Sequence, residues 1–212
     1  MASIIWDAIG SRTYEGGIDK GVLYLTNGTA VPWNGLVSIT EKATRSTTPI
    51  YFDGRKVMDL VEVGDYEATL EAITYPDEVL ELEGFGRMAN GVFVGDQRPQ
   101  IFHLSYQTKI GTDTLGQEAY YQLHILYNIT AIPSDKEYQS FSDDAEPMTF
   151  EWELTAIPED VPGFRPTAHV ILDSRYINGT LLNDIKTLLY GSAIVDPAFP
   201  PFETLMTIIT TS

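Results

Sequence analysis

The sequence predicts a mainly β protein in which two packed β-sheets, arranged as a sandwich or open barrel, are flanked by one α-helix near residues 179–190. Three observations lead to this fold class. Apolar and polar side chains alternate with a period of two in several segments, and turn dipeptides such as Asp-Gly and Asn-Gly separate apolar runs. A convincing helical period occurs in one segment.

The clearest strand lies within residues 65–75. One side of it carries the apolar side chains Tyr66, Ala68, Leu70 and Ala72. The other side carries Glu67, Thr69 and Glu71. Because successive side chains of a strand point to opposite faces, we expect the first set to face a core and the second to face away from it.

A tight hairpin is predicted where Asp53, Gly54 and Arg55 separate the apolar runs at residues 50–52 and 56–58. A type I′ turn needs positive φ at both central residues, and Asp-Gly is among the pairs that adopt it most readily.

The helix is predicted from an apolar stripe that begins at Leu181 and ends at Leu189, with Asn178 or Thr180 as the cap and Gly191 just beyond the end. A single helical turn is expected at residues 76–80, and a Pro-rich segment at 197–201 precedes a short apolar end at 205–209. Further strands are expected at residues 21–27, 31–44 with a break at Asn34-Gly35, 101–109, 119–128, 149–155 and 167–172.

Composition fits one domain over residues 1–212. The chain has no cysteine, which excludes disulfides, thiolate zinc sites and cysteine nucleophiles. The N-terminus lacks the basic region of a signal peptide, and no run of 18 apolar residues predicts a membrane span. The formal net charge of −17 disfavours binding to nucleic acid or anionic lipid. Nine acids and no Lys or Arg occur between residues 59 and 83.

Candidate catalytic and metal-binding residues are few. His103, His124 and His169 fall on polar positions of predicted strands without HxH or HExxH spacing, so we expect partly exposed histidines, with His103 and His124 as possible cross-strand neighbours, and no metal site. The carboxylate pairs Glu67–Glu71 and Glu151–Glu153 could serve a glycosidase, but 30 acids in 212 residues produce such pairs by chance. We therefore predict no catalytic residues, no cofactor and no enzymatic activity.

Several segments resemble a known family when they are taken together and in this order. They are GVLYLTNGTAVPWNGLVSITE (21–41), YFDGRKV (51–57), EVGDYEATLEAITYPDE (62–78), LSYQTKIGTDTLGQEAYYQLHILYN (104–128) and EPMTFEWELTAIPEDVPGFRPTAHVILDSR (146–175). The chain is similar in these segments to the major tail proteins, or tail tube proteins, of long-tailed, non-contractile bacteriophages of actinobacteria.

The resemblance implies a structural protein of the virion tail, assembled in the bacterial cytoplasm, whose hexameric rings stack into a tube for DNA ejection. Four strands per subunit would line the bore. With 24 strands about 4.8 Å apart and tilted by about 40°, the backbone diameter is about 48 Å, which admits duplex DNA. Each ring would carry 6 × −17 = −102 formal charges. The implied partners are further copies of the chain, a tape measure protein, a tail terminator and DNA passing without specific binding, with no membrane.

In such a tube, Glu67, Thr69 and Glu71 are expected to face the lumen, although the same face could be the wetted outer surface. The turn at Asp53, Gly54 and Arg55 is expected at an inter-subunit or inter-ring contact, and residues 1–20 and 192–212 are expected to form arms. Two alternatives stay open: a tube protein like that of type VI secretion systems, and a monomeric β-sandwich carbohydrate-binding module.

Overall fold

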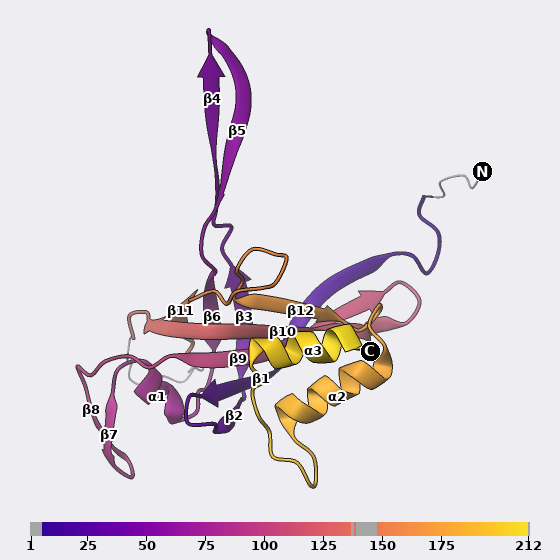
Figure 1. The fold of residues 1–212 in the computed structure, drawn as a ribbon. Helices are drawn as coiled ribbons and strands as arrows, with labels where there is room; N and C mark the ends of the chain where they lie inside the picture. Colours follow the sequence, from indigo (N-terminus) through magenta and orange to yellow (C-terminus); the bar gives the residue numbers. More distant parts are fainter. Residues whose placement is uncertain (1–5, 137, 139–147, 212) are drawn as a thin grey trace, which may run out of the picture.

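A computed structural model of the 212-residue chain describes residues 6–136, 138 and 148–211. Residues 1–5, which contribute to the expectation about a signal peptide, lie outside this range. The described residues form an eight-stranded antiparallel sheet, two separate two-stranded sheets and three helices (Figure 1). The expected mainly β fold with a flanking helix is confirmed.

The large sheet contains eight strands: β1 (Thr13–Leu25), β2 (Ala30–Trp33), β3 (Leu36–Glu41), β6 (Glu67–Ala72), β9 (Phe102–Thr112), β10 (Gly116–Pro133), β11 (Phe150–Ala156) and β12 (His169–Asp173). Their order is β2-β1-β9-β10-β11-β6-β3, and β12 also pairs with β10. The long β10 pairs with β12 through residues 122–126 and with β11 through residues 129–133. Most strands therefore belong to one large sheet, where the sequence predicted two packed sheets.

Two hydrophobic clusters stabilise this arrangement. One lies on the inner face of the sheet and includes Leu23, Leu70, Leu104 and Trp152, together with residues of the short helix α1 (Glu78–Leu82). The other lies between the opposite face and two helices, α2 (Gly179–Tyr190) and α3 (Phe202–Thr211), which run side by side in Figure 1. The sheet is therefore covered on both faces along its middle strands.

Several sequence predictions are confirmed in detail. The alternation in β6 places Ala68, Leu70 and Ala72 in the core. The predicted segment 31–44 divides into β2 and β3 around Gly35, whose φ is +82°. Helix α2 begins after Asn178, whose side chain accepts a hydrogen bond from the Thr180 amide. The expected helical turn near residue 78 corresponds to α1.

Other features differ from the sequence predictions. The strand expected at residues 21–27 starts earlier, because residues 13–20 also pair with β9. The C-terminal segment forms α3, which buries Phe202 and Leu205 against the sheet and α2. Two hairpins stand apart from the large sheet: β4 (Arg45–Phe52) with β5 (Arg55–Val63), and β7 (Gly86–Ala89) with β8 (Val92–Val94).

Candidate assembly surfaces and an internal histidine cluster

The β4–β5 hairpin projects from the body of the molecule (Figure 1). Its turn is the predicted Asp53-Gly54 pair, with φ angles of +48° and +76°. Phe52 pairs with Arg55 on either side of the turn. Positive φ at both central residues is the signature of the type I′ turn, so the predicted geometry is confirmed. Asp53, Gly54 and Arg55 thus occupy the exposed far end of the hairpin.

The hairpin exposes several large apolar side chains. Among the described strands, β4 and β5 pair only with each other. A two-stranded hairpin is marginally stable by itself, and contiguous apolar patches on a protein surface mark interaction sites. The large hydrophobic side chains that it exposes are Tyr51, Phe52, Val57, Met58, Leu60 and Val61.

The second surface is the outer face of β3, β6 and β11, opposite the inner core. Glu67, Thr69 and Glu71 lie on it, as their alternation predicts. Glu71 is directly opposite Glu151 on β11, and Thr69 is opposite Glu153. The two carboxylate pairs considered for a glycosidase therefore lie side by side on one strand face, instead of facing each other across a cleft.

Few contacts offset the charge of this acidic face. Lys42 forms an ion pair with Glu153, with an Nζ–Oε1 distance of 2.9 Å. Ser38 donates a hydrogen bond of 2.9 Å to Glu71. Because like charges on neighbouring strands repel, the face is held by the core packing beneath it, not by its own polar contacts.

The histidines are arranged differently from the sequence prediction. His124 is buried at 6% exposure, not partly exposed, because its side chain points to the inner side of the sheet. It lies opposite Tyr106 in the register of β9 and β10, so the suggested pairing with His103 is wrong. Its partner is His169 on β12, with 3.0 Å between His124 Nδ1 and His169 Nε2.

His124 and His169 form a cluster with Glu41, the last residue of β3. His169 Nδ1 lies 3.5 Å from Glu41 Oε1. The same oxygen accepts hydrogen bonds from Tyr106 at 3.1 Å and from Tyr66 at 3.5 Å. One potential ligand atom from each of Glu41, His124 and His169 lies within 4.8 Å of the others. The sequence could not reveal this grouping, because the three residues come from three strands far apart in the chain.

Burial sets the protonation of the cluster. It lowers the pKa of His124 to about 4, and the nearby His169 adds to this effect while Glu41 opposes it. Burial also lowers the pKa of His169 to about 4. The pKa values of Tyr66 and Tyr106 are raised, chiefly by burial. At neutral pH the cluster therefore combines two neutral imidazoles with two phenol donors.

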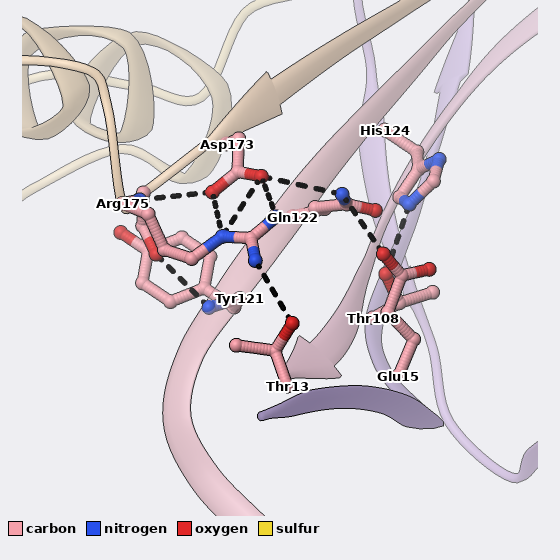
Figure 2. A network of polar contacts seen from close by, with 9 residues as sticks. Thr13, Glu15, Thr108, Tyr121, Gln122, His124, Asp173 and Arg175 are labelled. Carbon is pink, nitrogen blue, oxygen red and sulfur yellow. Dashed lines mark hydrogen bonds and ion pairs between the residues drawn. The ribbon is translucent and has the colours of Figure 1, made fainter. Parts of the chain in front are cut away.

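A polar network continues along the same side of the sheet (Figure 2). Arg175 donates to Asp173 with an Nη2–Oδ2 distance of 2.6 Å, and this hydrogen bond is the main cause of the lowered pKa of Asp173. Gln122 donates to Asp173 at 3.4 Å and to Glu15 at 3.3 Å. Arg175 also reaches Thr13 at 3.4 Å. These contacts tie the start of β1 to β10 and β12.

One charged residue lies inside the core. The side chain of Glu83, just after α1, is fully buried and accepts hydrogen bonds from Lys136 Nζ at 2.9 and 2.7 Å. It also accepts from Trp152 Nε1. Nothing in the sequence distinguishes Glu83 from the neighbouring acids, since its role depends on β11 packing against α1. We interpret this contact as structural.

No helix among the described residues has both the length and the apolar character needed to cross a membrane. No protein-family model matches the chain, and a search of curated proteins finds no match. Among solved structures, the chain is similar to the anti-feeding prophage cap, a tube terminating cap determined by cryo-EM. The TM-score is 0.37 at 13% identity, and the match covers 82% of this chain and 97% of that chain. This likeness assigns no function.

Proposed function

We propose that the chain is the structural subunit of a phage tail tube, in which rings of six copies stack into a channel for DNA. The projecting apolar hairpin is the observation that carries this proposal, and the resemblance of the sequence to major tail proteins supports it. In this proposal the protein has a structural role, not a catalytic one, and is located in the virion tail.

The hairpin needs a partner. Its apolar side chains stay exposed in the isolated chain, and burying apolar surface is worth about 25 cal/mol per Å². Because β4 and β5 gain no support from the large sheet, packing against a neighbour would both stabilise the hairpin and join subunits. A second copy of the chain is the partner that the tail-tube proposal requires. We assign the tip at Asp53, Gly54 and Arg55 to this contact between subunits or rings.

The acidic face fits the bore of such a tube. A surface that presents Glu67, Glu71, Glu151 and Glu153 repels phosphate, so DNA would pass without being held. We therefore place Glu67, Thr69 and Glu71 in the lumen. The domain would span residues 1–212, with a tape measure protein and tail terminator as further partners. Of the arms expected at residues 1–20 and 192–212, residues 13–20 belong to β1 and residues 202–211 form α3 on the chain's own sheet, so we do not assign these two stretches to contacts with neighbouring subunits.

Sedimentation velocity over a range of protein concentrations tests the role of the hairpin. Met58→Glu places a charge on the hairpin, where Met58 is 52% exposed, and we expect it to abolish assembly without lowering the melting temperature of the monomer. Met88→Glu is the matched control, because Met88 is 78% exposed on the other separate hairpin. The proposal fails if Met58→Glu assembles like the wild type. A wild-type chain that stays monomeric throughout would favour the carbohydrate-binding alternative.

A further inference from the structure

Glu41, His124 and His169 lie where the inner side of the curved sheet opens to the surface. A hollow of about 520 Å³ reaches Glu41 and His124, and its lining also includes Tyr106 and Thr108. His169 lines a neighbouring hollow. Glu41 lies on β3, an end strand of the sheet, whereas His124 and His169 lie on the adjacent strands β10 and β12. The three side chains thus approach one another from opposite sides of the opening.

The two imidazoles have the spacing of metal ligands. Zinc–nitrogen bonds measure about 2.0–2.1 Å, so two nitrogens that share one ion at 90–109° lie about 2.9–3.4 Å apart. His124 Nδ1 and His169 Nε2 are 3.0 Å apart. We propose that His124, His169 and Glu41 bind a transition-metal dication of the Zn²⁺ class, with the two facing nitrogens and a carboxylate oxygen of Glu41 as the protein ligands.

The surroundings hold each ligand in a suitable state. His124 Nε2 lies 3.0 Å from Thr108 Oγ1, which can accept a hydrogen bond from Nε2–H when Nδ1 binds the ion (Figure 2). His169 Nδ1 lies 3.5 Å from Glu41 Oε1, which places the carboxylate beside the His169 ring. Metal-bound histidines usually donate their second N–H to such an oxygen. The proton between the two facing nitrogens therefore moves to the outer nitrogen of its own ring, and no proton is lost.

Glu41 can complete the site by a small movement. Ligands on opposite sides of one ion are at most about 4.2 Å apart, whereas one potential ligand atom from each of the three residues lies within 4.8 Å of the others. The side chain of Glu41 is 43% exposed, so the carboxylate can turn by the remaining distance while it stays beside Tyr106 and Tyr66. Positions not taken by protein would face the hollow and bind water. The bound ion would link β3 to β10 and β12 across the opening and raise the melting temperature.

The test uses the untagged full-length protein after treatment with a chelator. Zn²⁺ titration by calorimetry, with metal content measured after gel filtration, should give one ion per chain. His124→Gln and His169→Gln should lose this stoichiometric binding, and Glu41→Gln should weaken it by at least tenfold. His103→Gln is the matched control and should bind like the wild type, because His103 lies outside the cluster. Co²⁺ in place of Zn²⁺ should give visible absorption bands that are also lost in His169→Gln.

Two results would overturn the site. One is a wild-type chain that takes up no Zn²⁺ at 100 µM metal, a generous level for a site with three protein ligands. The other is binding that stays unchanged in both His169→Gln and Glu41→Gln. Glu41 is the safeguard if the histidine variants fail to fold, because Gln at this position keeps a side-chain oxygen that can accept from Tyr106 and Tyr66. The result does not depend on the proposed function, since metal binding is measured on the unassembled chain.

Discussion

Gly54→Val tests the hairpin at a single backbone position. Gly54 has a φ of +76°, a conformation that β-branched residues resist. A Cβ added at Gly54 would meet no atom within 4 Å, so the cost is backbone strain alone. Such strain amounts to about 1–2 kcal/mol, which corresponds to a roughly 5- to 30-fold shift toward the open hairpin. Because β4 and β5 pair only with each other in the described chain, we expect the loss to be local.

Hydrogen exchange measured by mass spectrometry resolves this effect. Amides of β4 and β5 should exchange roughly 5- to 30-fold faster in Gly54→Val, while those of β9 and β10 keep wild-type rates. The melting temperature should change little, and assembly should weaken. Gly54→Asn is the control, because Asn tolerates positive φ better than other non-glycine residues. Wild-type exchange in the hairpin of Gly54→Val would refute the turn geometry and its proposed importance for assembly.

Three further predictions follow from other contacts. Glu83→Ala leaves Lys136 without its buried partner and should lower the free energy of unfolding by about 3 kcal/mol in urea titrations, whereas an effect below about 1 kcal/mol would mean that water replaces the carboxylate. Burial lowers the pKa of His103 in the folded chain, so the unfolded chain takes up its proton first as the pH falls below about 6.5. Stability should therefore decline over that range, by less in His103→Gln than in the wild type; equal declines would contradict this. Glu67→Lys with Glu71→Lys would add 6 × 2 = 12 Lys side chains to each proposed ring, so virions should assemble but eject DNA slowly at low salt, and unchanged rates at low and high salt would place both residues outside the bore.

The local structure could be predicted where a short pattern determines it. The period-two alternation of β6 fixes which side chains enter the core, and the Asp-Gly pair fixes the turn between β4 and β5. The apolar stripe of α2 likewise determines which side of the helix packs against the sheet. In each case the determining residues lie within about a dozen positions, so the pattern is visible without knowledge of the fold.

The internal cluster could not be predicted because it depends on sheet order. Glu41 meets His124 and His169 only because the sheet curves and brings β3 close to the middle strands. The spacing of these three residues along the sequence does not indicate that they are in contact. The absence of an HxH motif therefore did not exclude a histidine cluster in the folded chain. Helix α3 is a different case. Phe202, Leu205 and Ile209 have the spacing of one helix face, so this helix could have been predicted. The Pro-rich segment before them led instead to the expectation of a short apolar end.

Cryo-EM of the purified protein at high concentration tests the proposed function most directly. We predict stacked rings of six subunits that form a tube, with the β4–β5 hairpin buried between neighbouring subunits. Glu67, Thr69 and Glu71 should line the bore in the reconstruction. Single particles at every concentration, with the hairpin surrounded by solvent, would contradict the account, and tubes with the acidic face on the outside would contradict its assignment of the lumen.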